Sequence, residues 1–189
     1  MDVEGENNLP NGELKGPALI ICNHTSNLLD SCYVQSLTNH HIYWIGDIYL
    51  FQSTTIRLHH RRGFKWFFDT LGIIEVNRKN PIRALRTALE KSLHVFEKGG
   101  LVGIFPLGTY EEIKGKWDTY GHAGAVGILQ YAEKYLHTKI AIIPVGVIDG
   151  KRILVRFGKQ IMVPNNLETP QDRKTFAKFL LTTIRQLET

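Results

Sequence analysis

A histidine and an aspartate stand near each other in the sequence at a spacing that permits a catalytic pair. Asn23 and His24 directly follow the apolar run 18–22, and Asp30 comes six residues after His24. A carboxylate that keeps one imidazole nitrogen protonated leaves the other nitrogen able to take a proton from a substrate hydroxyl. This is the chemistry of the Ser-His-Asp triad, with the hydroxyl supplied by the substrate. The alternative is structural: His24 caps a helix or bonds to backbone, and Asp30 is solvated.

The common fingerprints of other catalytic classes are missing from the sequence. No G-x-S-x-G motif, phosphate-binding P-loop, H-E-x-x-H motif or paired C-x-x-C motif occurs. The glycines 121, 124 and 127 recur every third residue, which is not the dinucleotide pattern G-x-G-x-x-G. We therefore expect no metal site. We interpret Cys22 and Cys32 as buried free thiols, with a redox or metal role as the alternative.

Short apolar runs alternate with amphipathic segments along the chain, which is typical of an α/β domain. The apolar runs lack period-two polarity, as expected for parallel strands covered on both faces. Asn80 and Pro81 favour a helix start, because Asn is a good N-cap and Pro suits the first helical position. We expect strands over 17–22, 41–45, 72–76, 101–105, 140–147 and 153–157, and helices over 24–38, 81–96, 125–136 and 176–187.

Length and composition indicate one globular domain. The chain has 189 residues, of which 43% are hydrophobic and 22% charged. We predict a single α/β domain over 17–189, with a mostly parallel central sheet flanked by helices on both faces, after a polar lead over 1–16. Ligand residues are then expected just after the strands, because such sheets bind at the carboxyl ends of their strands.

The chain carries a formal net charge of +5, which suggests an anionic partner. The charge does not discriminate among four such partners: a lipid headgroup, a nucleic acid, a coenzyme phosphate and an acidic protein. The N-terminus lacks the basic and apolar regions of a secretory signal, and no apolar run has the length of a transmembrane helix. We therefore expect any membrane contact to be peripheral, or to depend on a segment outside this sequence.

Four sequence blocks, taken in order, resemble those of the glycerolipid acyltransferases, the family of the lysophosphatidic acid acyltransferases. NHTSNLLD at 23–30 resembles N-H-x4-D, and GIIEVNR at 72–78 resembles the family's G-x-x-[FI]-x-x-R strand. FPLGTY at 105–110 resembles F-P-E-G-T-R, and IIPVGV at 142–147 resembles an apolar strand that runs into P-V-G. The resemblance covers about residues 16–160.

The resemblance implies an acyl transfer in which His24 is the general base and Asp30 orients it. His24 would deprotonate an acceptor hydroxyl, which attacks an acyl thioester. The second-block Arg would bind acceptor phosphate, the third block would line the acceptor site, and the fourth-block Pro would shape the donor site. Without the family context, an ordinary surface Arg is the commoner outcome at the second-block position. The substrate-binding residues expected on this basis are Asn23, Arg78, Gly108, Thr109, Tyr110 and Pro144.

Two blocks depart from the family pattern. Five residues separate His24 from Asp30 instead of four, so Leu29 falls at the aspartate position in strict register. An extra loop residue before the helix would restore the geometry between His24 and Asp30. Asn27 is a weaker candidate for the role of the aspartate. In the third block Leu107 replaces Glu and Tyr110 replaces Arg. The acceptor site thereby loses a carboxylate and a cation, which favours a headgroup-bearing lysophospholipid, a lysoglycolipid or another lipid alcohol over lysophosphatidic acid.

Basic and aromatic residues are concentrated between residues 57 and 68. This mixture suits an anionic membrane surface, an acidic acyl carrier protein or the phosphates of coenzyme A. The alternative is a solvated basic loop whose aromatic rings lie in the core. We do not expect nucleic-acid binding, because no nucleic-acid fold or aromatic-basic repeat accompanies the charges. The residues expected to contact membrane or donor are Arg57, Arg61, Arg62, Lys65 and Trp66.

Two classes of function follow. The first is an acyltransferase that uses acyl-CoA or acyl carrier protein as donor and a lysolipid as acceptor, without cofactor or metal, on the cytoplasmic side of a membrane. The second is a non-catalytic lipid-binding or regulatory relative, which the altered first and third blocks suggest. The position of the Asp30 carboxylate discriminates them: within ~3.2 Å of His24 Nδ1 it supports the enzyme, and in solvent it supports the relative.

Overall fold

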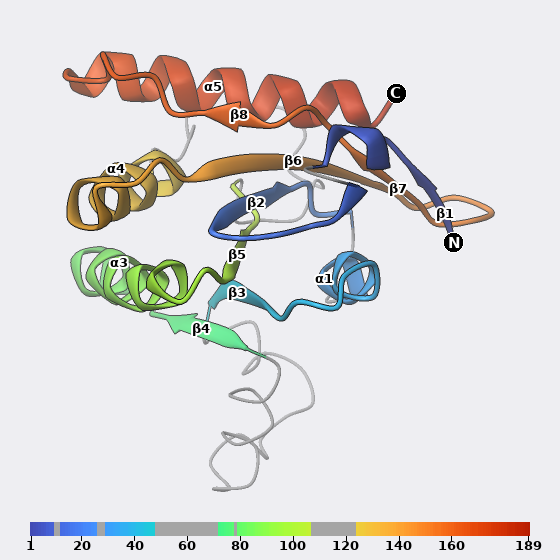
Figure 1. The fold of residues 1–189 in the computed structure, drawn as a ribbon, viewed down its shortest axis with the longest axis horizontal. Coiled ribbons are helices and arrows are strands. Elements are labelled where there is room, and N and C mark those ends of the chain that lie inside the picture. Colours follow the sequence, from blue (N-terminus) through green and yellow to red (C-terminus); the bar gives the residue numbers. More distant parts are fainter. Residues whose placement is uncertain (10–11, 26–28, 48–71, 78, 107–123) are drawn as a thin grey trace, which may run out of the picture.

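The structure is a computed structural model, which describes residues 1–9, 12–25, 29–47, 72–77, 79–106 and 124–189 (Figure 1). Its central feature is a sheet of eight strands. The strands are β1 (Asp2–Glu4), β2 (Ala18–Cys22), β3 (Ile42–Asp47), β4 (Ile73–Val76), β5 (Leu101–Ile104), β6 (Ala141–Ile148), β7 (Leu154–Phe157) and β8 (Ile161–Met162).

Five neighbouring strands run parallel, in the order β6, β2, β5, β3 and β4. β7 and β8 both pair with β6 in the antiparallel sense, and β1 lies parallel to β7 at the edge. The predicted α/β fold with a mostly parallel sheet is therefore confirmed. The carboxyl ends of the five parallel strands lie along one edge of the sheet, which we call the carboxyl edge.

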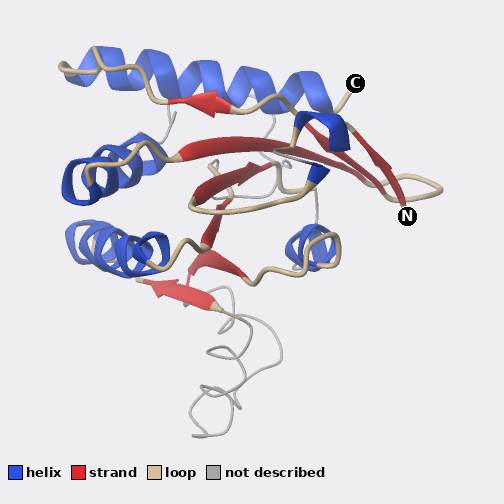
Figure 2. Cartoon of the chain, viewed as in Figure 1, coloured by secondary structure: helices blue, strands red, loops and turns tan. Residues whose placement is uncertain are grey.

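Helices cover both faces of the sheet (Figures 1 and 2). α3 (Pro81–Glu97), α4 (Gly124–Leu136) and α5 (Pro170–Leu187) share one hydrophobic core with the first face. α1 (Leu29–Gln35) packs on the second face through Val34, together with Leu9 and Leu14 from the segment before β2. Alternate residues of a strand point into different cores, as Ile142 and Ile143 of β6 do.

Local signals fix the helix ends. The Asn80 side chain accepts a hydrogen bond from the Arg83 amide at 3.2 Å, and α3 starts at Pro81, as predicted. Gly99 follows α3 with φ of 69°, a value that favours glycine at a helix end. α5 starts six residues before the expected position, because Thr169 and Asp172 form a capping box at its N-terminus.

The polar lead predicted over 1–16 contributes a strand, β1, to the sheet. β1 pairs with β7, and the Glu4 carboxylate lies 2.7 Å from Nε of Arg156. A short 3-10 helix, η1 (Glu6–Asn8), follows, and the Asn8 side chain donates to the Phe157 carbonyl at 2.8 Å. β1 has an edge position and mostly exposed side chains, so hydrophobic periodicity carries no signal for it.

Candidate active site

His24 and Asp30 form a buried pair just beyond the carboxyl end of β2. Nδ1 of His24 lies 2.7 Å from Oδ2 of Asp30, and the two residues are 7% and 1% exposed. Because an ionised carboxylate only accepts hydrogen bonds, a carboxylate at this position favours the imidazole tautomer that carries its proton on Nδ1. The pair therefore has the arrangement of a general base held in one tautomer by a carboxylate.

Thr25 fixes the other contacts of the Asp30 carboxylate. The Thr25 amide donates to Oδ2 at 3.0 Å, and the Thr25 hydroxyl donates to Oδ1 at 2.7 Å. Both carboxylate oxygens thus have donors, and the side chain is held against rotation. We did not single out Thr25 from the sequence; the signal that was available is a hydroxyl residue between a candidate His and the helix that carries its Asp.

The extra residue between His24 and Asp30 does not displace the carboxylate. Asp30 points into the protein toward His24, whereas Leu29, which holds the aspartate position in strict family register, is 50% exposed. The distance of 2.7 Å lies within the ~3.2 Å that was set as the criterion in favour of the enzyme. Asn27 lies outside the described residues.

Asn23 makes contacts that differ from the expected substrate binding. Its Nδ2 donates to the Val147 carbonyl at 2.8 Å, and its Oδ1 accepts from the Val147 amide at 2.7 Å. The buried side chain therefore continues the hydrogen bonding between β2 and β6 by one residue after β2 ends. Because Asn23 precedes His24 directly, this brace fixes the backbone from which the imidazole projects.

Pro144 lies inside β6, where a missing amide hydrogen would normally leave a ladder bond unmade. The Pro144 carbonyl accepts from the Gly158 amide at 2.9 Å, so this side of the residue faces the segment between β7 and β8. β7 pairs with β6 from Val145 onward and β8 pairs with it up to Ile142, so Pro144 sits at the gap between them. The position shows a role in sheet geometry; the expected role at the donor site stays a prediction.

The Phe105 ring covers one face of the His24 imidazole, with the ring centroids 4.5 Å apart. Phe105 follows β5, the neighbour of β2, so both residues stand at the carboxyl edge. The other expected site residues lie outside the described residues, so their placement is not tested. They are Arg78, Gly108, Thr109 and Tyr110 for the substrate, and Arg57, Arg61, Arg62, Lys65 and Trp66 for the membrane or donor.

The two cysteines differ in exposure. Cys22 is fully buried, as expected, and burial raises the pKa of its thiol well above the ordinary value, with a smaller contribution from the charge of Asp30. Cys32 is exposed on α1, so the expectation that both thiols are buried was wrong for it. α1 is short and only one side of it meets the core, and Cys32 lies on the other side.

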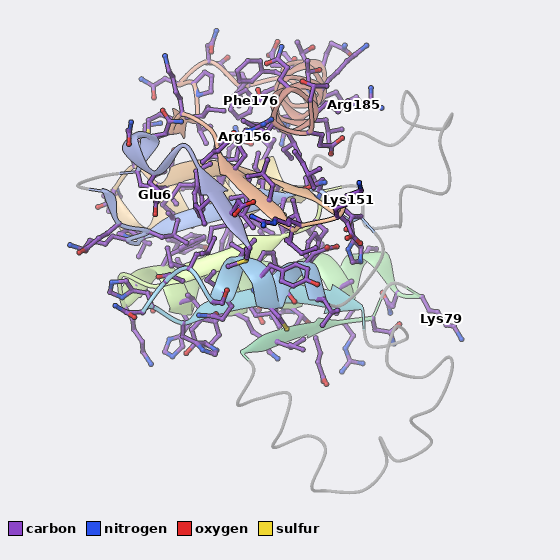
Figure 3. All side chains as sticks on the ribbon, turned by 90° about the vertical axis from the view of Figure 1, so that its right-hand side faces the viewer. Glu6, Lys79, Lys151, Arg156, Phe176 and Arg185 are labelled. Atoms are coloured by element: carbon purple, nitrogen blue, oxygen red, sulfur yellow. The ribbon has the colours of Figure 1, made fainter. Side chains whose placement is uncertain are left out.

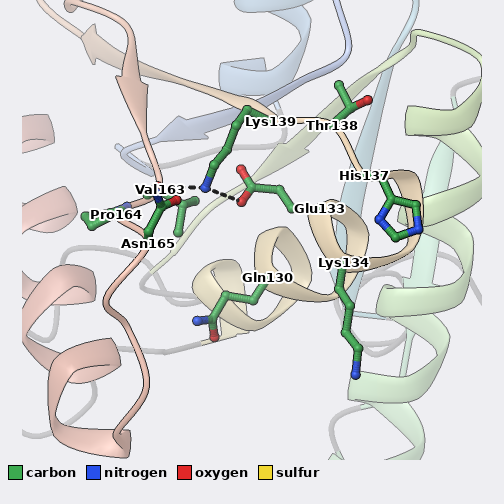
Figure 4. A pocket seen from close by; sticks show the side chains of 9 residues that line it. All are labelled: Gln130, Glu133, Lys134, His137, Thr138, Lys139, Val163, Pro164 and Asn165. Carbon is green, nitrogen blue, oxygen red and sulfur yellow. Dashed lines mark hydrogen bonds and ion pairs between the residues drawn. The ribbon is translucent and has the colours of Figure 1, made fainter.

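A pocket of about 340 Å³ lies at the opposite edge of the sheet, where Thr138 and Lys139, which precede β6, are among its lining residues (Figure 4). Lys139 reaches across it and pairs with Glu133 at 2.9 Å, and it also donates to the Val163 carbonyl at 3.2 Å. The Gln130 amide donates to the Leu167 carbonyl at 2.9 Å. These contacts tie α4 to the segment around β8, so we assign the pocket a structural role.

The family model for acyltransferases matches residues 1–148, which is most of the chain. The chain belongs to the Acyltransferase family. A search of solved structures finds the 1-acyl-sn-glycerophosphate acyltransferase PlsC of Thermotoga maritima, with a TM-score of 0.59 and 17% identity, over 98% of this chain and 70% of that one. At this identity the likeness shows the shared fold. A comparison with curated proteins finds no significant match. Among the described helices, none has the length and apolarity needed to cross a bilayer.

Proposed function

We propose that this protein transfers a fatty acyl group from an acyl thioester to a hydroxyl of a lysolipid, with His24 as the general base. The observation that carries the proposal is the 2.7 Å contact between His24 Nδ1 and Asp30 in a member of the Acyltransferase family. The acyl group of acyl-CoA or of acyl carrier protein is the proposed donor, and the reaction belongs to glycerolipid synthesis or remodelling.

In the proposed reaction the acceptor hydroxyl gives its proton to Nε2 of His24 while its oxygen bonds to the thioester carbonyl carbon. The C–S bond then breaks, and the departing thiolate takes the proton from the imidazolium. The products are the acylated acceptor and a free thiol, and His24 returns to its neutral form. Asp30 stays ionised throughout and stabilises the imidazolium by the hydrogen bond at Nδ1.

The acceptor we propose is a lysolipid that bears a headgroup. The relative in Thermotoga maritima is a 1-acyl-sn-glycerophosphate acyltransferase, which acts on a phosphate monoester. This chain has Leu107 and Tyr110 where the family pattern has Glu and Arg, so one phosphate-binding cation is replaced by a neutral phenol. Arg78 is then the one phosphate-binding cation of the family pattern that this sequence keeps.

We also propose a peripheral contact between the carboxyl edge and an anionic membrane, which would bring the lipid acceptor to His24. In the first turns of α3, Ile82 is 84% exposed and Leu85 is also exposed, although both are apolar. Lys79 and Lys151, which follow the carboxyl ends of β4 and β6, lie toward the same side of the molecule (Figure 3). Exposed apolar side chains and cations on one side of a molecule suit the interface of a bilayer.

The test is a thioester-consumption assay with purified protein, long-chain acyl-CoA or acyl carrier protein as donor, and a panel of lysolipids. The His24→Ala variant should lose acyl transfer by about 10²- to 10⁴-fold while it stays folded. His94→Ala removes an exposed histidine from α3 and is the matched control, with an expected rate equal to that of the unmodified protein. A His24→Ala variant of unchanged rate would refute the assignment. No turnover of any acceptor by the unmodified protein would favour the non-catalytic relative.

A further inference from the structure

The rings of three side chains form a stack that starts at His24. The imidazole of His24 and the ring of Phe105 have centroids 4.5 Å apart and an interplanar angle of 23°. Phe105 and Trp44 follow with 4.8 Å and 16°. Phe105 therefore contacts the imidazole on its face, whereas Asp30 contacts it on its edge through Nδ1. The imidazole is held from two perpendicular directions.

The geometry of the sheet produces the stack. His24 follows β2, Phe105 follows β5 and Trp44 lies in β3, and these strands are neighbours in the order β2, β5 and β3. β2 and β5 pair through Ile21 and Ile104. Trp44 pairs with Gly103, two residues before Phe105, so the rings of Trp44 and Phe105 are diagonal neighbours on one face of the sheet. The stack thus begins on β3 and extends beyond the carboxyl ends of β5 and β2.

Trp44 contributes its ring surface to the stack. It is only 6% exposed, and its Nε1 has no hydrogen-bond partner within the described part of the chain. Such a buried N–H is a cost to the folded state. The indole lies flat on Gly103 of β5, and a Cβ at Gly103 would collide with it. Trp44 provides a flat apolar surface on which the Phe105 ring packs.

We propose that Phe105 positions the imidazole of His24 and stabilises the imidazolium that forms while His24 carries the proton of the acceptor, and that Trp44 holds Phe105 in place. This inference rests on the proposed function, because acyl transfer is what creates the imidazolium. The face of an aromatic ring attracts a cation within about 6 Å of its centroid. Since the imidazole is neutral before proton transfer, this attraction lowers the barrier rather than tightening substrate binding.

The first experiment compares substitutions at Phe105 in the full chain. Phe105→Leu should lower kcat about 3- to 30-fold with little change in KM, because it removes the ring face and keeps an apolar side chain. Phe105→Tyr keeps the ring and should keep kcat. Phe176→Leu removes a buried phenylalanine from the other core and should lower stability without lowering kcat. An equal loss of kcat in Phe176→Leu, or no loss in Phe105→Leu, would overturn the inference.

The second experiment separates charge stabilisation from packing. Phenylalanines with one, two and three ring fluorines at position 105 keep the ring shape and progressively weaken the negative face of the ring. We expect kcat to fall stepwise with each fluorine, while the melting temperature changes little. A kcat independent of fluorination would overturn the role in imidazolium stabilisation.

The third experiment tests Trp44. Trp44→Phe retains a ring and loses no hydrogen bond, because Nε1 has none to lose among the described residues, so it should keep most of kcat. Trp44→Leu removes the ring that packs on Phe105 and should reproduce the kcat loss of Phe105→Leu. Equal kcat in Trp44→Phe and Trp44→Leu would overturn the supporting role of Trp44.

A measurement without substrate distinguishes failure of this inference from failure of the proposed function. In proton NMR spectra, a ring stacked on the His24 imidazole displaces its proton resonances upfield, and Phe105→Leu should remove that displacement while Phe176→Leu leaves it. If the enzyme is active and the His24 resonances are not displaced, the positioning by Phe105 is overturned and the proposed function stands. Displaced resonances in a protein that transfers no acyl group would overturn the proposed function and the imidazolium role, with the positioning intact.

Discussion

At the scale of single residues, the sequence predicted the pair that the structure brings together and missed what supports it. His24 and Asp30 are six residues apart, and local spacing with the family pattern was enough to select them. Asn23 bonds to Val147, which is 124 residues away in the sequence, and its expected contact with substrate stays a prediction. Phe105 likewise meets His24 only because β2 and β5 are neighbours. Long-range contacts of this kind have no signature in residue spacing.

The contrast between the two thiols leads to a first prediction. Burial raises the pKa of the Cys22 thiol, so little of it is thiolate near neutral pH, and it is also out of contact with solvent. A thiol reagent should therefore modify the exposed Cys32 in the native protein and reach Cys22 only after unfolding. Mass spectrometry of peptides after timed labelling measures this order. Equal labelling rates would show that the region around β2 opens readily.

The composition of the third block leads to a second prediction, on the acceptor. Tyr110 offers a neutral hydroxyl and a ring face, which suit a phosphodiester or sugar better than a dianionic monoester. Tyr110→Arg should shift preference toward lysophosphatidic acid, because a guanidinium binds phosphate by two parallel hydrogen bonds. The measure is kcat/KM for lysophosphatidic acid divided by kcat/KM for a headgroup-bearing lysolipid, in both proteins. A strong preference of the unmodified protein for lysophosphatidic acid would contradict this account of the acceptor site.

At the scale of elements, hydrophobic runs predicted the interior of the sheet and missed its margins. The apolar runs at 18–22 and 141–148 are central strands, and such strands are apolar because helices cover both faces. β1 and β8 are short and lie at the margin, where half-exposed side chains blur the pattern. α5 also begins earlier than its apolar residues suggested, since a capping box rather than burial defines its start.

That capping box carries the third prediction. Thr169→Ala removes the hydroxyl that bonds to Asp172 and to its amide, and it should lower the free energy of unfolding by about 1 kcal/mol at neutral pH. The hydrogen bond from the Thr169 side chain lowers the pKa of Asp172, so its contribution to stability is present above the ordinary carboxyl pKa. It is lost as pH falls through the lowered value.

Urea unfolding of both proteins, at neutral pH and below the lowered pKa of Asp172, measures this effect. The stability difference between them should be smaller in acid. Thr182→Ala, on the same helix, is the matched control, because its hydroxyl donates to the Lys178 carbonyl within the helix and caps no helix end. A Thr169→Ala loss no larger than that of Thr182→Ala would contradict the assigned role of the box.

At the scale of the whole molecule, the parallel order of five strands assembles the site at one edge. His24, Phe105 and Lys79 come from three distant parts of the chain, and each follows a strand of the same direction. The sequence predicted this gathering because parallel strands end at a common edge. It did not predict which exposed side chains surround the edge. Ile82 belongs to the apolar stripe of α3 by spacing, yet it lies beyond the part of that helix that the core covers.

The fourth prediction concerns how the molecule meets a membrane. Replacing Arg57, Arg61, Arg62 and Lys65 together by Gln should weaken binding to anionic vesicles and hardly affect binding to neutral ones. Each cation near an anionic surface is worth about 1 kcal/mol, and salt screens this attraction. Binding of the unmodified protein should therefore also fall as salt rises. Vesicle sedimentation at two salt concentrations measures both effects, and equal loss on both vesicle types would indicate damaged folding instead.

Ile82→Asp complements that charge variant, because it changes apolar contact at the edge while the four cations stay. It should weaken binding to anionic and to neutral vesicles, since insertion of an apolar side chain does not depend on lipid charge. Phe179→Asp, at an apolar residue of α5 that is 50% exposed, is the matched control and should bind vesicles as the unmodified protein does. The unmodified protein, Ile82→Asp and Phe179→Asp should all still hydrolyse or transfer the acyl group of short-chain, soluble substrates. If Ile82→Asp and Phe179→Asp weaken binding equally, the first turns of α3 are not the part of the molecule that enters the bilayer.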